Sequence, residues 1–194
     1  DVDEVTPQLQ ERFEQVVAAL DRWEGWTTNR CNPPVLILGE RHGVELGLRQ
    51  QRRAIPLKTT TVAGLTVPTP AEMLRVKAFL LAERRVTRDY IDVAALAHYL
   101  GESEALTALS FLNLLYPGRE PQSAITRLAE ACESEPVDLA AIPLPSYKGL
   151  KAPFTDWACV GAICQTLGRA LIRLELSEAL PRSLEPGFGH ESVS

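Results

Sequence analysis

Four charged side chains interrupt an apolar helical stretch between residues 75 and 96, RVKAFLLAERRVTRDYIDVAAL. Lys77, Arg84, Arg88 and Asp92 follow one another at spacings of seven, four and four residues. Because an α-helix turns by about 100° per residue, all four would share one side if a single helix ran through the stretch. The residues one turn from Lys77 in either direction are Met or Leu, so its ammonium group would be partly desolvated unless an anion met it.

Two interpretations of this stretch are open. In the structural one, Lys77 extends past its own helix to water, and Arg88 and Asp92 form an ordinary i,i+4 ion pair. In the functional one, the cations bind an anion such as a polyphosphate. Arg84 and Arg88 would then grip phosphate oxygens bidentately, Lys77 would act as a point charge, and Asp92 would orient one cation or touch the substrate.

A second group of candidates is acidic. Asp1 and Asp3 form a D-x-D pair whose side chains would project from the same face of a strand. Such carboxylates suit two Mg²⁺ ions that bridge a triphosphate, because hard cations prefer oxygen ligands. Glu45, in the alternating segment VELGLRQ, is the best candidate for a third ligand on a neighbouring strand. An acidic terminus and a solvated strand face explain the same residues without a metal.

The elements that must position these residues predict an α+β fold. We expect a helix that ends near Asp21, a loop at 29–34 (NRCNPP), and strands at 35–39 and 44–50. A second hairpin is expected at 59–67. Thr69, Pro70 and Glu72 form a capping box that starts a helix to about Glu83, and another helix runs from Thr87 or Arg88 to Gly101. Helices near 103–115, 122–133 and 155–179 would complete the chain.

The expected organisation is therefore a mixed sheet with helices over residues 1–68, a helical domain over 69–180 that carries the Lys/Arg/Asp stretch, and a flexible tail over 181–194. The loop SYKG (146–149) either contacts an acceptor molecule or merely joins two helices. A net charge of −5 argues against a generally cationic, nucleic-acid-coating surface. The four cysteines are widely spread and the sequence has no long apolar run, so we expect reduced thiols, no membrane contact and a cytoplasmic location.

Together these pieces resemble the AbiEii-type nucleotidyltransferases, the toxin halves of two-gene bacterial toxin–antitoxin and abortive-infection systems, within the polymerase-β-like nucleotidyltransferase superfamily. The block from Val67 to Leu96, VPTPAEMLRVKAFLLAERRVTRDYIDVAAL, resembles the family's pattern most closely. It has a Lys, an Arg seven residues on, an Arg-Asp four after that, and then an Asp. Asp1-x-Asp3 is similar to the family's metal-binding D-x-D. The resemblance covers residues 1 to about 100 and only loosely the helical remainder.

The resemblance implies a nucleotidyltransferase-like fold, NTP and two-metal Mg²⁺ binding, and transfer of a nucleotidyl group to RNA such as a tRNA 3′ end, or to protein. It implies that Asp1 and Asp3 hold metal, with Glu45 added from strand geometry. Lys77 would contact the triphosphate, with Arg84 and Arg88 in support. Asp92 would be the essential acidic residue, which either positions Lys77 or activates the acceptor hydroxyl. A cognate antitoxin is an implied partner.

The family also has a Gly-Gly or Gly-Ser phosphate turn about ten residues before the D-x-D. This segment is expected to be lacking in a chain that starts at Asp1. The sequence thus leaves two hypotheses: an active Mg²⁺-dependent nucleotidyltransferase, or a truncated or degenerate form that binds nucleotide, RNA or an antitoxin without turnover.

Overall fold

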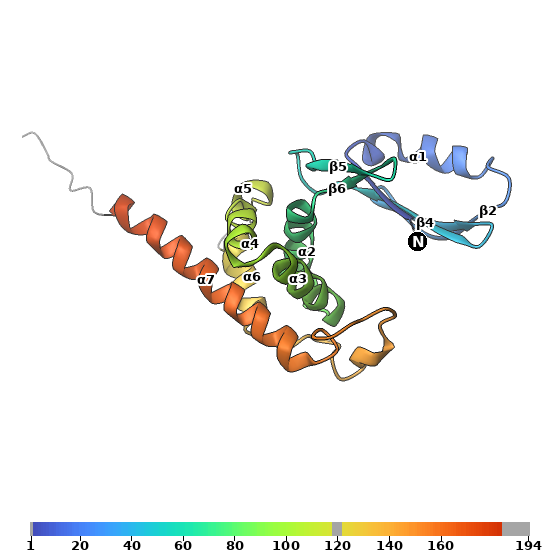
Figure 1. Cartoon of the computed structure of the whole chain (residues 1–194). Helices are drawn as coiled ribbons and strands as arrows, with labels where there is room; N and C mark the ends of the chain where they lie inside the picture. Colours follow the sequence, from blue (N-terminus) through green and yellow to red (C-terminus); the bar gives the residue numbers. More distant parts are fainter. Residues whose placement is uncertain (1, 118–121, 184–194) are drawn as a thin grey trace, which may run out of the picture. The chain divides into compact units, whose positions relative to one another are not determined.

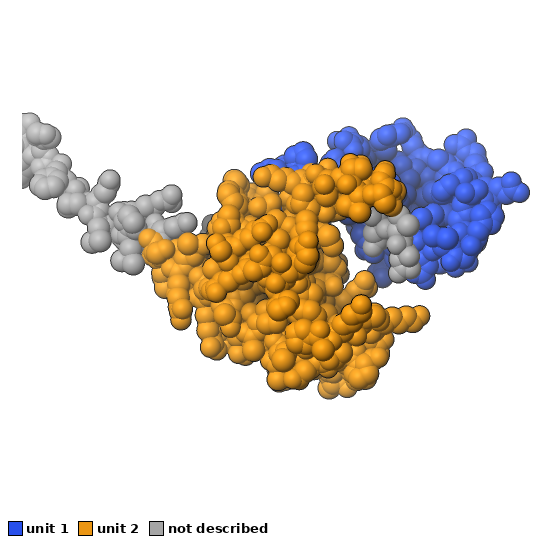
Figure 2. Space-filling model, viewed as in Figure 1, with its two compact units in different colours: residues 1–56 blue, residues 57–194 orange. Residues whose placement is uncertain are grey.

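The structure, a computed structural model, describes residues 2–117 and 122–183 and has an α+β fold (Figure 1). It divides into two compact units, Asp1–Pro56 and Leu57–Ser194 (Figure 2). The boundary expected from the sequence lay at residue 68, whereas the contacts group the second hairpin with the helices. Of the expected tail, 181–183 belong to the last helix and 184–194 lie outside the described residues.

Unit 1 is a four-stranded mixed sheet with one helix on it. Its elements are β1 (Val2–Thr6), α1 (Leu9–Leu20), β2 (Trp26–Asn32), β3 (Leu36–Arg41) and β4 (Val44–Gln50). The strand order is β1-β4-β3-β2, with β1 parallel to β4 and the other pairs antiparallel. Leu9 and Phe13 of α1 pack on Ile37, so this helix covers the sheet face to which Ile37 belongs.

The prediction of a loop at 29–34 is wrong for residues 29–32, because β2 continues through Asn32. This strand pairs only with β3, at one edge of the described sheet, and its register shifts between Thr28 and Arg30. An edge strand with a bulge tolerates asparagine, since it packs and pairs on one side alone. The prolines Pro33 and Pro34 follow directly after the strand.

Unit 2 consists of a hairpin and a helical bundle. Its elements are β5 (Thr59–Val62), β6 (Leu65–Pro68), α2 (Pro70–Arg84), α3 (Thr87–Leu100), α4 (Glu102–Leu109), α5 (Leu112–Leu115), α6 (Ala124–Cys132), the 3₁₀ turn η1 (Leu144–Ser146) and α7 (Trp157–Ser183). The expected helical C-terminal region is confirmed. A single apolar core joins α2, α3, α4, α5, α6 and α7, with Leu74, Tyr90 and Leu171 fully buried.

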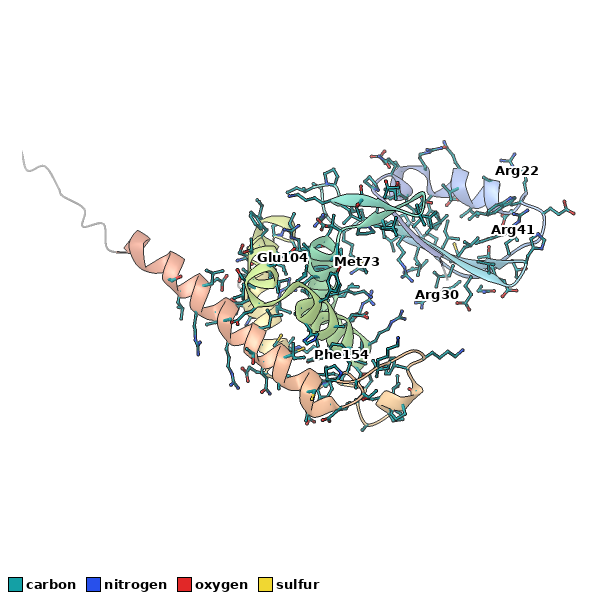
Figure 3. The ribbon with its side chains drawn as sticks, viewed as in Figure 1. Arg22, Arg30, Arg41, Met73, Glu104 and Phe154 are labelled. Atoms are coloured by element: carbon teal, nitrogen blue, oxygen red, sulfur yellow. The ribbon has the colours of Figure 1, made fainter. Side chains whose placement is uncertain are left out.

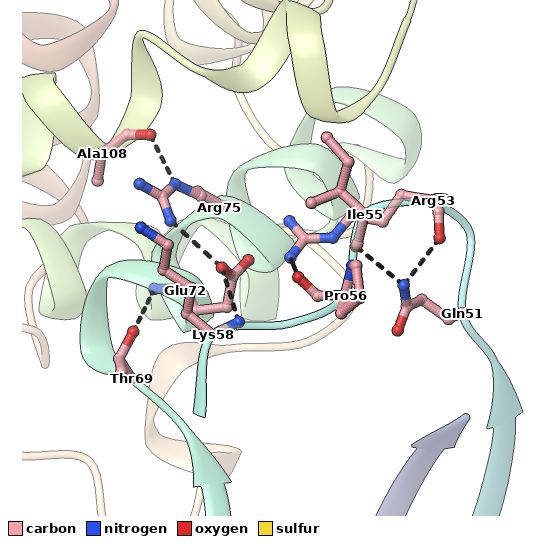
Figure 4. Close-up of polar contacts among 9 residues, drawn as sticks. All are labelled: Gln51, Arg53, Ile55, Pro56, Lys58, Thr69, Glu72, Arg75 and Ala108. Carbon is pink, nitrogen blue, oxygen red and sulfur yellow. Dashed lines mark hydrogen bonds and ion pairs between the residues drawn. The ribbon is translucent and has the colours of Figure 1, made fainter. Parts of the chain in front are cut away.

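A buried polar network fixes the start of α2 (Figure 4). The Thr69 hydroxyl accepts a hydrogen bond from the Glu72 amide at 3.3 Å, which confirms Thr69 as the N-cap, and the Thr69 amide donates to the Lys58 carbonyl oxygen at 3.0 Å. The Glu72 carboxylate in turn accepts from the Lys58 amide and from Arg75, both at 3.2 Å, and Arg75 donates to the Ala108 carbonyl oxygen at 2.8 Å. Helix α2 is therefore held to the segment that leads into β5 and to the end of α4.

Candidate functional site

The charged stretch does not form one helix. Arg85 adopts a left-handed conformation with φ 52° and ends α2, and α3 starts at Thr87. The two separate helices expected from the capping box and from Thr87 or Arg88 are confirmed, so the condition for aligning all four charges on one helix is not met. The two helices instead pack side by side, and this packing brings residues of the stretch together across the α2–α3 contact.

Lys77 and Asp92 meet across this contact. The Lys77 Nζ atom donates a hydrogen bond to Asp92 Oδ2 at 2.6 Å, and the two side chains are 26% and 31% exposed. Asp92 therefore pairs with Lys77 rather than forming the i,i+4 pair with Arg88 that the structural interpretation required. A charge-assisted bond of this length fixes the ammonium group at the half-buried surface of the helix pair.

Arg84 and Arg88 lie at the facing ends of the two helices, Arg84 in the last turn of α2 and Arg88 in the first turn of α3. Both side chains are exposed, and within the residues that the structure describes neither forms a hydrogen bond or an ion pair. Guanidinium groups in this state are available to an anion.

Sequence reasoning missed Asp89, which directly follows Arg88. Its side chain is 3% exposed, and its Oδ2 atom has no hydrogen-bond partner among the described residues. Burial raises the pKa of Asp89 above its usual value, and the charge of Asp92 acts in the same direction. The charges of Arg84, Lys77 and Arg88 oppose this rise, Arg84 the most. The available signal was an acidic residue one turn before Asp92, on the same side of α3.

A distant segment holds the start of α3. Asp138 Oδ1 accepts hydrogen bonds from the Thr87 amide at 2.7 Å and the Thr87 hydroxyl at 2.8 Å, and the Val137 amide donates to the Arg85 carbonyl oxygen at 2.8 Å. Asp138 thus satisfies one of the amides at the start of α3 that have no acceptor within the helix, where the N-cap residue Val86 has no side-chain hydrogen bond.

The chain that follows Asp138 stays close to α3. Burial raises the pKa of Tyr147 and Asp138 adds to the rise, while the nearby charge of Arg88 lowers it, so the phenol lies beside the first turn of α3. Phe154 packs edge-to-face on His98 in the last turn of the same helix, with ring centroids 5.7 Å apart (Figure 3). The loop SYKG therefore belongs to the surroundings of the candidate site.

The predicted metal ligands belong to unit 1. Asp1 lies outside the described residues, and Asp3 pairs in register with Gly47, two residues along β4 from Glu45. Glu45 lies on the face of β4 opposite the one that carries Leu48, which packs under α1 beside its cross-strand partner Ile37. Glu45 is exposed, and Glu40 is its cross-strand partner on the same face.

This donor set has the right chemistry for Mg²⁺, since carboxylate oxygens are its preferred protein ligands. Among the side chains that the structure describes, which include Glu45 but not Asp1 or Asp3, no three of His, Cys, Asp or Glu are grouped closely enough to hold a metal ion. The magnesium site stays a prediction. In the same described part of the chain, no helix is both long and apolar enough to cross a membrane.

Comparison with known proteins gives partial matches only. No family model matches the chain, and no solved structure matches it. The heme uptake protein MmpL11 of Mycobacterium tuberculosis and the probable transport protein MmpL11 of Mycobacterium bovis are each 30% identical to it over 136 residues. These matches cover 62% of this chain and 13% of each relative. A mycolic acid-containing lipids exporter, MmpL11 of Mycolicibacterium smegmatis, is 30% identical over 95 residues, 43% of this chain and 10% of the relative.

Proposed function

We propose that the chain is a Mg²⁺-dependent nucleotidyltransferase that transfers a nucleotidyl group from an NTP to RNA, such as tRNA, or to protein. The Lys77–Asp92 pair carries this proposal. A lysine held at 2.6 Å by a carboxylate, with two unpaired arginines at the adjoining helix ends, is a cationic group prepared for a polyphosphate. The resemblance to the AbiEii family extends the proposal to a cytoplasmic toxin with a cognate antitoxin.

In this mechanism the protein positions its substrates and neutralises charge. Lys77 binds the triphosphate, and Asp92 positions Lys77, because the carboxylate is already engaged with the ammonium group. Arg84 and Arg88 bind the remaining phosphate oxygens. Asp1, Asp3 and Glu45 would hold the Mg²⁺, which supplies further charge neutralisation. The acceptor hydroxyl attacks the α-phosphorus and gives up its proton to water, and pyrophosphate leaves with the electrons of the broken P–O bond.

The first test exchanges the charges of the pair. Lys77→Ala and Asp92→Ala should each lower labelling of an RNA acceptor by an α-labelled NTP by about a hundredfold or more. The double exchange Lys77→Asp with Asp92→Lys should restore the ion pair, and with it any stability lost in the single variants, while labelling stays absent. Glu104→Gln, an exposed surface change on α4, is the control.

If both alanine variants fold and label as the wild type does, the assignment of Lys77 and Asp92 is wrong. If the double exchange recovers labelling, the pair serves the fold alone. A second measurement follows the melting temperature with Mg²⁺ and each NTP in turn, which should rise for at least one nucleotide. Stabilisation by NTP without labelling of RNA or protein would favour the non-catalytic binding module.

The matches to MmpL11 favour a second candidate, since the M. tuberculosis relative is named a heme uptake protein. On this alternative, the part of the chain that resembles MmpL11 binds heme. A hemin titration followed in the Soret band tests it: saturable binding of one equivalent would support it, and an unshifted band would exclude it.

A further inference from the structure

Asp89 is a buried acid that the proposed mechanism does not use. Its Oδ2 atom lacks a hydrogen-bond donor among the described residues although the side chain is only 3% exposed. A buried carboxylate oxygen without a hydrogen bond lowers the free energy of unfolding, and an apolar residue in its place would avoid this loss. The presence of an acid here therefore needs an explanation. The surrounding charges point to the explanation.

Two of the three cations of the site, Lys77 and Arg84, can each be matched with one acid. Asp92 already binds Lys77 directly. Of the charges that act on Asp89, that of Arg84 is the strongest favourable one, and Arg84 is exposed and has no partner of its own. The two residues stand on either side of the sharp turn at Arg85, Arg84 in the last turn of α2 and Asp89 in the first turn of α3. In the ligand-free chain the two groups attract each other without a hydrogen bond.

We propose that Asp89 is a positioning residue for Arg84, and that a bound triphosphate brings the Arg84 guanidinium onto the unpartnered Oδ2 of Asp89. One edge of the planar guanidinium then faces the carboxylate and the other faces a phosphate oxygen, which the fork of N–H donors allows. The missing hydrogen bond of the free chain is made only in the complex, so its free energy contributes to ligand binding rather than to folding. This inference rests on the proposed function and adds a specific contact to it.

The contact predicts coupling that depends on the ligand. Asp89→Asn and Arg84→Gln should each weaken binding of the tightest of the four NTPs with Mg²⁺, and of inorganic triphosphate, by about tenfold. The double variant should bind no more weakly than Arg84→Gln alone, because Asp89 acts on the ligand only through Arg84. Without ligand, the coupling of the two changes in the free energy of unfolding should be smaller, since the two groups then attract each other without a hydrogen bond. Isothermal titration calorimetry and denaturant unfolding measure the two quantities on the full chain.

Controls separate the possible failures. The losses of binding free energy caused by Asp89→Asn and by Arg88→Gln should add in the double variant, since Arg88 is assigned to phosphate alone. Arg84→Lys leaves the buried carboxylate unchanged, so a similar loss of affinity in this variant tests the contact even if Asp89→Asn fails to fold. Additive losses for Asp89 and Arg84, in a wild type that binds NTP, would overturn the inference and leave the proposed function standing. A wild type that binds neither NTP nor triphosphate would overturn both.

Discussion

Asp89 and Asp92 lie one turn apart on α3 and have opposite surroundings. Asp92 is about one-third exposed and holds Lys77, whereas Asp89 is buried without a donor for Oδ2. Environment therefore divides the two acids into a paired group and an unpaired one, as at many sites where carboxylates have different roles. Residue type and spacing identified Lys77 and Asp92 as candidates but not which atoms they meet, because the pairing depends on how two helices pack.

The unpaired acid makes stability depend on pH. Since burial raises the pKa of Asp89 above its ordinary value of 3.8, the folded chain binds this proton more tightly than the unfolded chain. The contribution of Asp89 to stability is present at low pH and decreases as pH rises past 3.8 towards the raised pKa. Asp89→Asn, which stays neutral, should therefore gain in melting temperature relative to wild type between about pH 4 and pH 8.

Differential scanning fluorimetry across this range checks the prediction, because the difference between variant and wild type cancels all other titrating groups. Glu135→Gln removes one negative charge from an exposed position of the same unit and is the control for the charge change alone. A difference for Asp89→Asn that does not vary with pH would contradict the raised pKa of Asp89.

At the scale of elements, the α2–α3 turn shows what local sequence determines. Thr69 and Glu72 predict the start of α2, because capping chemistry acts within one turn of helix. The start of α3 was also expected at Thr87 or Arg88, but its cap could not be predicted. Asp138, which satisfies the Thr87 amide, lies 51 residues further along the chain. Only the packing of the bundle brings this carboxylate to the helix end.

Removal of this distant cap should destabilise unit 2. Asp138→Ala leaves the Thr87 amide without its acceptor and should lower the free energy of unfolding by about 1–2 kcal/mol, the usual effect of losing an N-cap. Glu135→Ala removes an equal charge from the same connection and should change it by less than about 0.5 kcal/mol. Urea denaturation compares the two. Equal effects of both changes would show that charge rather than capping matters.

At the scale of the molecule, the two units differ in the size of their cores. The core of unit 2 joins the six helices α2 to α7, whereas the buried apolar side chains of unit 1 within the described residues are Leu9, Phe13 and Ile37. The α+β class followed from strand and helix patterns, which are local. The sequence predicted a loop where β2 runs through NRCN, residues 29–32, because pairing with β3 outweighs the low strand propensity of asparagine.

Because the two cores differ in size, we expect the two units to differ in whether they fold as separate fragments. A fragment of residues 57–194 should fold alone with a cooperative thermal transition, while a fragment of residues 1–56 should not, since fewer apolar side chains offset its chain entropy. Circular dichroism of the separate fragments checks this. A sharp transition in the shorter fragment would show that its sheet is stable without the helical unit.

The hydrogen bonds between the α2–α3 turn and Asp138 also bear on how the site opens. The amides of Thr87 and Val137 point into the same junction and are held by acceptors from each other's segment. Neither amide can exchange with solvent deuterium until the junction separates. The two amides should therefore exchange at similar rates as one cooperative unit, although they lie far apart in the sequence. A ligand that tightens the turn should slow the exchange of both together.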